Sequence, residues 1–142
     1  SYEFETDKGA TRLVREPVGV CGFITPWNWP VNQIACKVAP ALAVGCSFVA
    51  RPAELTPLSA LAMGVLAQRA GVPAGLFNII PSSKSSEVGK ELCSNPKVAK
   101  ITFTGSTRVG KLVAQAAAKN LTPVGFYRVS SWAEARRWRI DR

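Results

Sequence analysis

Three short polar segments could carry chemistry, and each directly follows an apolar run that is typical of a buried strand. In the first, an apolar run ending at Ile24 is followed by Thr25-Pro26-Trp27-Asn28-Trp29-Pro30. The two prolines stiffen this loop, because proline lacks an N–H and restricts the residue before it. The Asn28 amide could donate a hydrogen bond to an oxygen that gains negative charge. The alternative is a proline-rich turn whose tryptophans belong to the core.

The second and third segments suit parts of a dinucleotide. Arg51-Pro52-Ala53-Glu54 places a carboxylate where it could accept both hydroxyls of a ribose. The third segment is Phe103-Thr104-Gly105-Ser106-Thr107. Gly105 would let a ligand approach the backbone, and Ser106 at a helix start favours binding of a pyrophosphate. A solvated charge pair and an ordinary helix cap are the respective alternatives. The sequence lacks the G-x-G-x-x-G fingerprint of many dinucleotide sites.

The elements that must position these segments alternate between strand and helix. Such alternation with short links predicts an α/β fold, here a partial Rossmann-like parallel sheet with flanking helices. The carboxyl ends of parallel strands share one edge of the sheet, which is where open α/β sheets bind ligands. The expected strands are residues 11–15, 18–24, 47–50, 76–80 and 100–104. The expected helices are residues 31–44, one that begins at Pro57, residues 85–92, and one that opens at Gly105-Ser106.

The proline positions and the apolar spacing describe these helices further. Pro40 predicts a kink or a break in the first helix. The second helix begins with Thr56 as N-cap and Pro57 at its first position. Apolar side chains define one face in each of the second and fourth helices: Leu58, Leu61, Val65 and Leu66, and Val109, Leu112, Val113, Ala116 and Ala117.

Composition restricts the class of protein. A chain of 142 residues is expected to form one domain. The absence of histidine excludes Ser-His and Cys-His pairs, and the cysteines show neither metal spacing nor a C-x-x-C pair, so no metal site is expected. No apolar run reaches membrane-spanning length, and the polar first residues do not resemble a signal peptide. We therefore expect a reducing, cytoplasmic location for the four cysteines, Cys21, Cys36, Cys46 and Cys93.

The net charge of +9 is concentrated only near the end of the sequence. Residues 1–124 carry 13 Lys and Arg against 7 Asp and Glu, which is +6, and residues 125–142 carry 5 against 2, which is +3 in 18 residues. A basic, Trp-containing tail could contact phosphates or a membrane surface. However, no nucleic-acid motif accompanies it, so we expect neither a specific nucleic acid nor a membrane as partner.

Taken together, the motifs resemble the aldehyde dehydrogenase superfamily over about residues 12–124. Each motif alone is moderately specific, but their order and spacing are very specific. The matching segments are Ile24-Thr25-Pro26-Trp27-Asn28-Trp29-Pro30, Lys37-Val38-Ala39-Pro40-Ala41-Leu42, Gly45-Cys46, Arg51-Pro52-Ala53-Glu54, Gly71-Val72-Pro73-Ala74-Gly75-Leu76-Phe77-Asn78 and Phe103-Thr104-Gly105-Ser106-Thr107.

The resemblance implies a role for each matched position. Asn28 is similar to the family's oxyanion-hole amide, and Lys37 matches a lysine near the active site. Arg51 and Glu54 resemble the pair on the adenosine ribose, and Ser106, with Gly105, resembles the pyrophosphate contact. Thr25, Pro26 and Trp27 are likewise expected at the cofactor.

The implied reaction is oxidation of an aldehyde to a carboxylate, with hydride transfer to NAD or NADP, in a homo-oligomer. Glu54 favours NAD because it would repel a 2′-phosphate, whereas Arg51, where the family usually has lysine, could compensate that phosphate. The region from Pro57 to Ser86 is similar to semialdehyde dehydrogenases. This similarity favours succinate semialdehyde as the substrate. The support is weak, because Cys36 replaces an arginine that enzymes acting on succinate semialdehyde commonly carry.

Two catalytic groups of the family have no match. Its general base lies in a Glu-Leu-Gly-Gly motif expected shortly after Val124, and none of the four cysteines occupies the nucleophile's position. The resemblance therefore predicts a truncated fragment, with residues 1–124 as part of an NAD(P)-binding domain and 125–142 as a non-family basic tail. Without a thiolate no hydride is released, so the isolated chain is expected to be inactive. The alternative is a non-catalytic nucleotide-binding or interaction module.

The tail itself suggests a reading-frame change. Back-translating residues 125–129 as GGT TTC TAT CGA GTT and moving one base forward gives Val-Ser-Ile-Glu. This is the family's lead-in to its general base, at about the right place. We therefore interpret residues 125–142 as a frame-shifted product that is poorly ordered or packed on the sheet edge.

Overall fold

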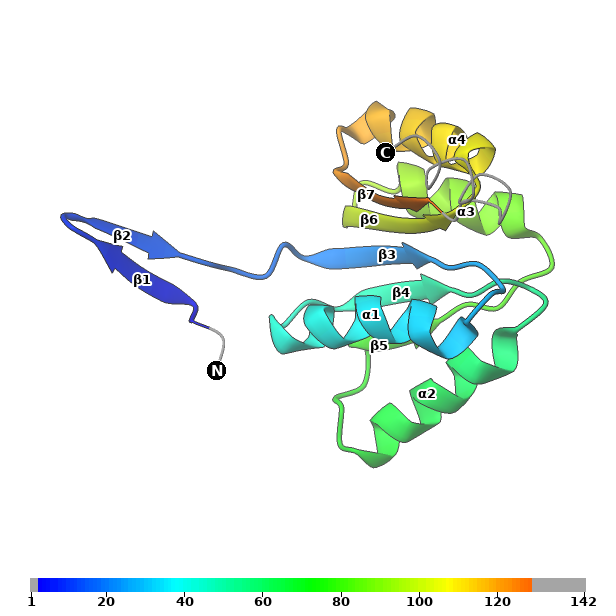
Figure 1. The fold of residues 1–142 in the computed structure, drawn as a ribbon, viewed down its shortest axis with the longest axis horizontal. Helices are drawn as coiled ribbons and strands as arrows, with labels where there is room; N and C mark the ends of the chain where they lie inside the picture. Colours follow the sequence, from blue (N-terminus) through cyan, green and yellow to red (C-terminus); the bar gives the residue numbers. More distant parts are fainter. Residues whose placement is uncertain (1–2, 129–142) are drawn as a thin grey trace, which may run out of the picture.

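A five-stranded parallel sheet with helices on both faces forms the body of the computed structural model, which describes residues 3–128 (Figure 1). The strand order is β5-β4-β3-β6-β7, and all four neighbouring pairs are parallel. This arrangement confirms the predicted α/β class. The strands are β3 (Val20–Ile24), β4 (Phe48–Arg51), β5 (Phe77–Ile79), β6 (Val98–Gly105) and β7 (Val124–Arg128).

Four α-helices connect these strands. Helix α1 directly follows Trp29, whose φ of 52° lies in the left-handed region. At the start of α4, the Ser106 hydroxyl accepts a hydrogen bond from the Val109 N–H at 3.4 Å. Such a cap satisfies one of the backbone donors that a helix start leaves free. The helices are α1 (Pro30–Ala43), α2 (Pro57–Arg69), α3 (Ser85–Ser94) and α4 (Thr107–Ala117), the last continued by a 3₁₀ turn, η1 (Ala118–Asn120).

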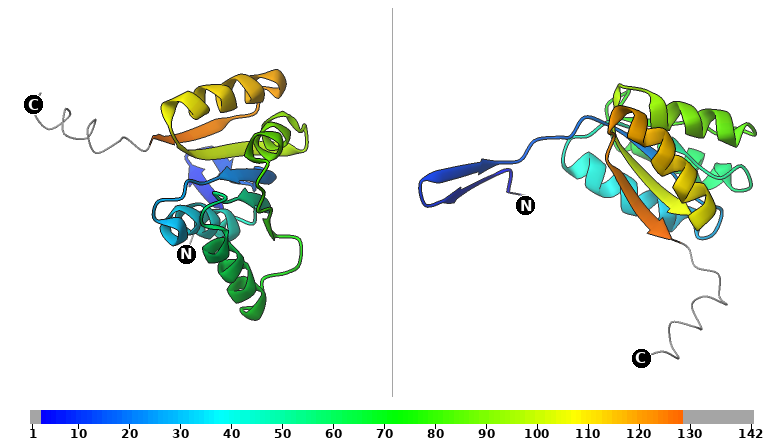
Figure 2. Two further views of the ribbon diagram at one scale, coloured as in Figure 1. Left: turned by 90° about the vertical axis from the view of Figure 1, so that its right-hand side faces the viewer. Right: turned by 90° about the horizontal axis from the view of Figure 1, so that it is seen from above.

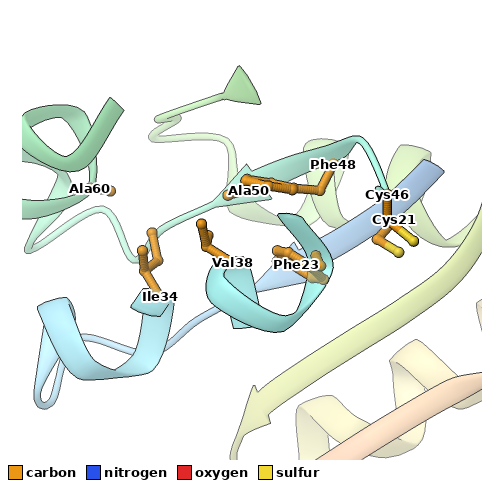
Figure 3. Close-up of a cluster of buried hydrophobic side chains, with 9 residues drawn as sticks. Cys21, Phe23, Ile34, Val38, Cys46, Phe48, Ala50 and Ala60 are labelled. Carbon is orange, nitrogen blue, oxygen red and sulfur yellow. The ribbon is translucent and has the colours of Figure 1, made fainter. Parts of the chain in front are cut away.

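The alternation of β3 side chains divides the core into two clusters. Cys21 and Phe23 face α1 and α2, where the Phe48 ring stacks on Phe23 with the ring centroids 5.1 Å apart (Figure 3). Phe48 also contacts Phe77, whose ring is tilted against it with the centroids 4.7 Å apart. Ile24 faces α3 and α4 on the other side. Burial of both faces explains why β3 is an almost continuous apolar run, as expected of a central parallel strand. The second cluster comprises Ile24, Leu92, Cys93, Val98, Ile101, Phe103 and Val113.

A separate antiparallel hairpin projects away from this body, as Figure 1 and the right-hand view of Figure 2 show. It consists of β1 (Glu5–Lys8) and β2 (Thr11–Val14), joined at Gly9 with a φ of 59°. The strand predicted at residues 11–15 is confirmed as β2. Its partner β1 was not predicted, because its charged residues lack the apolar alternation of a half-buried strand.

The apolar face of α2 that the sequence indicates is not the face that packs on the sheet. Leu58, Leu61, Val65 and Leu66 are all exposed, whereas Ala60 is buried and Met63 packs on the first core cluster. The close approach of α2 to the sheet explains this orientation, since a Cβ on Gly64 would lie 2.9 Å from the Ile79 side chain. Small residues therefore face the sheet, and the large leucines face outward.

Three further expectations need correction. Helix α1 runs continuously from Pro30 to Ala43, so Pro40 does not break it, while the alternative of a kink stays a prediction. In α4 the buried stripe is Gly110, Val113 and Ala117, so Val109 and Leu112 are exposed. Residues 124–128 form β7 at the sheet edge, a strand that the apolar pattern did not predict. The boundary between the NAD(P)-binding part and the tail at residue 124 stays a prediction. The rest of the tail, residues 129–142, lies outside the described residues.

Candidate functional site

The three predicted polar segments follow adjacent strands and reach the same edge of the sheet. Ile24 at the end of β3 is paired with Arg51 of β4 on one side and with Phe103 of β6 on the other. Because these strands are parallel, the loops after Ile24, Arg51 and Gly105 all begin at this edge. The order β4-β3-β6 puts the loop that contains Asn28 between the other two.

The loop after β3 combines a buried anchor with exposed side chains. Thr25 is 3% exposed, and its N–H donates to the Arg51 carbonyl oxygen at 3.2 Å. Trp27 and Trp29 are 62% and 74% exposed, so the alternative that placed these tryptophans in the core is wrong. Asn28 is half-buried, and its amide makes no hydrogen bond within residues 3–128. That amide is therefore available to a ligand.

Lys37 is buried below this loop, on α1. It is 5% exposed, and its Nζ donates to Thr104 Oγ1 at 2.7 Å and to the Gln33 carbonyl oxygen at 3.2 Å. The ammonium also lies 5.4 Å from the ring centroid of Tyr127. Burial lowers the pKa of Lys37, and the neighbouring Cys36 opposes this shift only in part. The result is a cation held between α1, β6 and β7.

Lys37 also borders a cavity of about 610 Å³ on the α1 face of the sheet. Cys36, Thr104 and Tyr127 line the same cavity. Sequence analysis missed Thr104 and Tyr127 as neighbours of Lys37. Lys37 and Thr104 are 67 positions apart in sequence, with two crossover connections between them, so no local pattern could have revealed the contact.

Arg51 and Glu54 are connected through a third side chain. The Ser85 hydroxyl accepts a hydrogen bond from Arg51 Nη2 and donates one to Glu54 Oε2 at 3.0 Å. Arg51 is 9% exposed, and burial lowers its pKa while the nearby Glu54 carboxylate opposes the shift. Sequence analysis predicted the helix that begins at Ser85 but did not identify this serine as a site residue.

Gly105 and Ser106 border a second pocket, of about 280 Å³, between β6, β7 and α4. A Cβ on Gly105 would lie 2.6 Å from the buried Phe103 ring, so this position requires glycine. Neither Arg51 nor Glu54 lines this pocket. The single groove that we expect for Arg51, Glu54 and Ser106 stays a prediction.

These residues are compatible with a nucleotide. The Nε–H of Arg51 is buried and has no hydrogen-bond partner within the described residues, which leaves one donor unused beside the Glu54 carboxylate. A buried donor without a partner is costly unless a ligand or water supplies an acceptor. A ribose presents both hydroxyl acceptors and hydroxyl donors. The first turn of α4 adds backbone N–H groups of the kind that bind phosphate.

Other kinds of site are less well supported in the described part of the chain. Residues 3–128 contain no group of three or more His, Cys, Asp and Glu side chains that could hold a metal ion. Within the same range, no helix has both the length and the hydropathy to cross a membrane. The four cysteines are free, and only Cys36 is exposed.

Comparison with known proteins gives a consistent result. The family model described as the aldehyde dehydrogenase family matches residues 2–126. The chain is 52% identical over 123 residues to a 3-succinoylsemialdehyde-pyridine dehydrogenase of Pseudomonas sp, a match that covers 87% of this chain and 26% of that protein. It is 53% identical over 114 residues to an NADP(+) succinate-semialdehyde dehydrogenase of Saccharomyces cerevisiae, covering 80% and 23% respectively.

A solved structure agrees with these relatives. A mutant of aldehyde dehydrogenase C from Pseudomonas syringae, in complex with NAD+ and octanal, superposes with a TM-score of 0.88 at 48% identity. The match covers 92% of this chain but 27% of that one. The chain thus spans about a quarter of the length of the relatives it matches, and it belongs to the aldehyde dehydrogenase family.

Proposed function

We propose that this chain is the nucleotide-binding part of an NAD(P)-dependent aldehyde dehydrogenase, which oxidises an aldehyde to a carboxylate. The observation that supports it best is the register of β3 with β4 and β6, which brings the loops after Ile24, Arg51 and Gly105 to one sheet edge. The family membership of residues 2–126 gives independent support.

Within this proposal, two groups of residues bind the dinucleotide. Arg51 and Glu54 hold the adenosine ribose, for which the unpartnered Nε–H and the carboxylate are suited. Gly105, Ser106 and the first turn of α4 receive the pyrophosphate. Thr25, Pro26 and Trp27 border the cofactor from the loop after β3. When bound, the nicotinamide supplies the hydride acceptor.

Two further residues act at the reacting end. The Asn28 amide donates to the substrate oxygen as negative charge develops on it, an interaction that stabilises the transition state more than the ground state. Its availability supports this role, since the amide makes no hydrogen bond within residues 3–128. Lys37 stays fixed by Thr104 and Gln33 and contributes a buried positive charge nearby.

The choice of dinucleotide follows from opposing charges. Glu54 would repel a 2′-phosphate and so favours NAD, whereas Arg51 could pair with that phosphate. Among the relatives, the Saccharomyces cerevisiae protein is named for NADP, and the Pseudomonas syringae structure holds NAD+. We propose NAD as the preferred cofactor, because Ser85 already accepts a hydrogen bond from Arg51.

The proposed substrate class is a semialdehyde, in line with the names of the two relatives above. Cys36, exposed on α1 beside Lys37, cannot pair with a substrate carboxylate as an arginine would. The absence of an arginine at this position weakens the case for succinate semialdehyde, which is still the semialdehyde that we propose first. We further propose that the full-length enzyme is a homo-oligomer and that it works in a reducing, cytoplasmic compartment.

For this chain alone we propose nucleotide binding without catalysis. A non-catalytic interaction module is the second candidate, and the exposed leucines of α2 favour it. Calorimetric titration of the chain with NAD+ and with nicotinamide mononucleotide separates the two candidates. Saturable binding of NAD+ with clearly weaker binding of the mononucleotide, which lacks the adenosine, is the expected result. No heat of binding for either compound would contradict the proposed function.

A further inference from the structure

We infer that Ser85, the first residue of α3, is a positioning residue that holds Arg51 and Glu54 apart in the nucleotide site and thereby favours NAD over NADP. The inference rests on the proposed function, since it names what determines the choice of dinucleotide at that same site. Neither the family motifs nor the sequence pattern assigns a role to Ser85.

The geometry of the hydroxyl supports this role. A serine hydroxyl has one proton and two acceptor lone pairs. Here the proton goes to Glu54 Oε2 at 3.0 Å, and a lone pair accepts the Arg51 Nη2–H. Both partners are ionised groups, so both hydrogen bonds are of the stronger, charge-assisted kind. Ser85 reaches them from α3, 34 and 31 residues away in sequence, and therefore fixes α3 relative to the end of β4.

The bridge replaces a direct ion pair. Among the described residues, Arg51 and Glu54 form no salt bridge with each other, and the ion pairs present are Arg12–Glu5 and Lys84–Glu87. If the hydroxyl is removed, nothing separates the guanidinium from the carboxylate. A direct Arg–carboxylate pair is often bidentate, so it would occupy both carboxylate oxygens.

That rearrangement has opposite consequences for the two dinucleotides. Binding of NAD needs a free Glu54 oxygen for the ribose hydroxyls, and a direct pair with Arg51 would remove it. Binding of NADP is opposed by the Glu54 charge, and the same pair would neutralise that charge. Loss of the Ser85 hydroxyl therefore weakens NAD binding and relieves the penalty on NADP.

The test measures the dissociation constants of NAD+ and NADP+ by calorimetry for the wild-type chain, Ser85→Ala, Ser85→Thr and Ser86→Ala. We expect the preference for NAD+ over NADP+ to fall about fivefold to tenfold in Ser85→Ala, as for a lost hydrogen bond to a charged group. Ser85→Thr keeps the hydroxyl and should restore the wild-type ratio. Ser86→Ala, at the exposed next position of the same helix turn, is the matched control and should leave the ratio unchanged.

Each remaining outcome is decisive. Equal weakening of both dinucleotides in Ser85→Ala, with the ratio unchanged, would mean that Ser85 only supports the fold; it overturns the inference and leaves the proposed function intact. Binding of neither dinucleotide by the wild-type chain refutes the proposed function, and the inference with it. If Ser85→Ala does not fold, as judged by far-UV circular dichroism, Ser85→Gly removes the same hydroxyl.

Discussion

At the residue scale, Glu54 carries the charge on which the proposed choice of dinucleotide depends. Its carboxylate receives a hydrogen bond from Ser85, and Arg51 lies on the other side of that hydroxyl. Changing Glu54→Ser should weaken the binding of NAD+ by about 1–2 kcal/mol, the size of a lost charge-assisted hydrogen bond. The same change should increase the affinity for NADP+ relative to NAD+, because it removes a charge that repels the 2′-phosphate. Calorimetric titration with both dinucleotides measures this shift.

A second substitution serves as the control for Glu54. Glu87→Ser also removes one carboxylate, but Glu87 is exposed and its ion-pair partner is the equally exposed Lys84. Surface pairs of this kind contribute little. The preference between the dinucleotides should therefore stay unchanged in Glu87→Ser. An equal change in both variants would indicate a general charge effect instead of a contact at the ribose.

Cys21 makes a prediction about stability at alkaline pH. Burial, and then the neighbouring Cys46, raises the pKa of Cys21 from its ordinary value of 9.0 to about 11, while Lys100 lowers it. Because the unfolded thiol loses its proton first, the folded state binds more protons between these values, and stability falls as the pH rises from 9.0 to about 11. The full loss is on the order of 2 kcal/mol.

Urea unfolding of the wild-type chain and of Cys21→Ala across this pH range tests the Cys21 prediction. Cys21→Ala should lose less stability than the wild type as the pH rises. Lys37 has a lowered pKa and so contributes with the opposite sign, but it is present in both proteins and cancels in the comparison. Parallel pH profiles for the two proteins would show that Cys21 does not titrate as proposed.

At the element scale, the packing of α3 on the sheet depends on Gly22 in β3. A Cβ at this position would lie 2.7 Å from Ile101 Cδ1, and Ile101 is fully buried in the second core cluster. Gly22→Ala should therefore destabilise the fold by about 1–3 kcal/mol, as overpacking of a core does. The measurement is the midpoint of urea unfolding, with the slope of the transition unchanged.

Gly89 provides a matched control for Gly22 because the same substitution meets open space there. No atom lies within 4 Å of a Cβ on Gly89, which is inside α3. Alanine is the better helix former, so Gly89→Ala should be neutral or stabilising by about 0.5–1 kcal/mol. A Gly22→Ala protein as stable as Gly89→Ala would show that the core around Ile101 is less tightly packed than the structure indicates.

The sequence predicts the elements well where one residue pattern decides them. Strand β3 is buried on both faces and reads as one apolar run, and Pro57 directly marks the start of α2. Burial of helix faces is less predictable, because the distance to the neighbouring layer decides it. Gly64 allows α2 to approach β5 closely, so Ala60 is the residue of α2 that is buried, while Leu58 and Leu66 face outward.

The candidate site is predictable only in part, for a similar reason. Arg51 and Gly105 end strands β4 and β6, and Asn28 lies in the loop after β3, so parallel pairing is enough to bring them to one edge. The contacts of Ser85 with Arg51 and of Thr104 with Lys37 join residues 34 and 67 apart. Such contacts depend on how α3 and α1 are oriented on the sheet, which no local pattern specifies.

At the scale of the whole molecule, the composition of residues 125–142 leads to a prediction about the coding DNA. Strand β7 begins inside the family match, yet Arg128 stands at the position where the shifted frame would place the family's general base. If the tail is a frame-shifted product, an alternate frame should encode Glu-Leu-Gly-Gly soon after Val124. Sequencing the coding DNA tests this hypothesis, and the absence of that motif from the alternate frames would contradict it.

The last prediction is that the 142-residue chain alone does not oxidise aldehydes. It spans about a quarter of its relatives, and none of its cysteines stands in the family's nucleophile context. Cys21, Cys46 and Cys93 are also buried, and burial raises the pKa of Cys21 and Cys93, which opposes formation of a reactive thiolate. We expect no cofactor reduction with a panel of aldehydes and NAD+ or NADP+, measured by absorbance.

Two variants show what any observed turnover would mean. Cofactor reduction that rises with chain concentration, and survives both Asn28→Ala and loss of all four cysteines, would contradict the family mechanism. Reduction that disappears when Cys36 alone is changed would instead overturn the assignment of residues, because Cys36 is the one exposed thiol in the described part of the chain. Cys36 would then be the nucleophile, at the exposed position next to the buried Lys37 on α1.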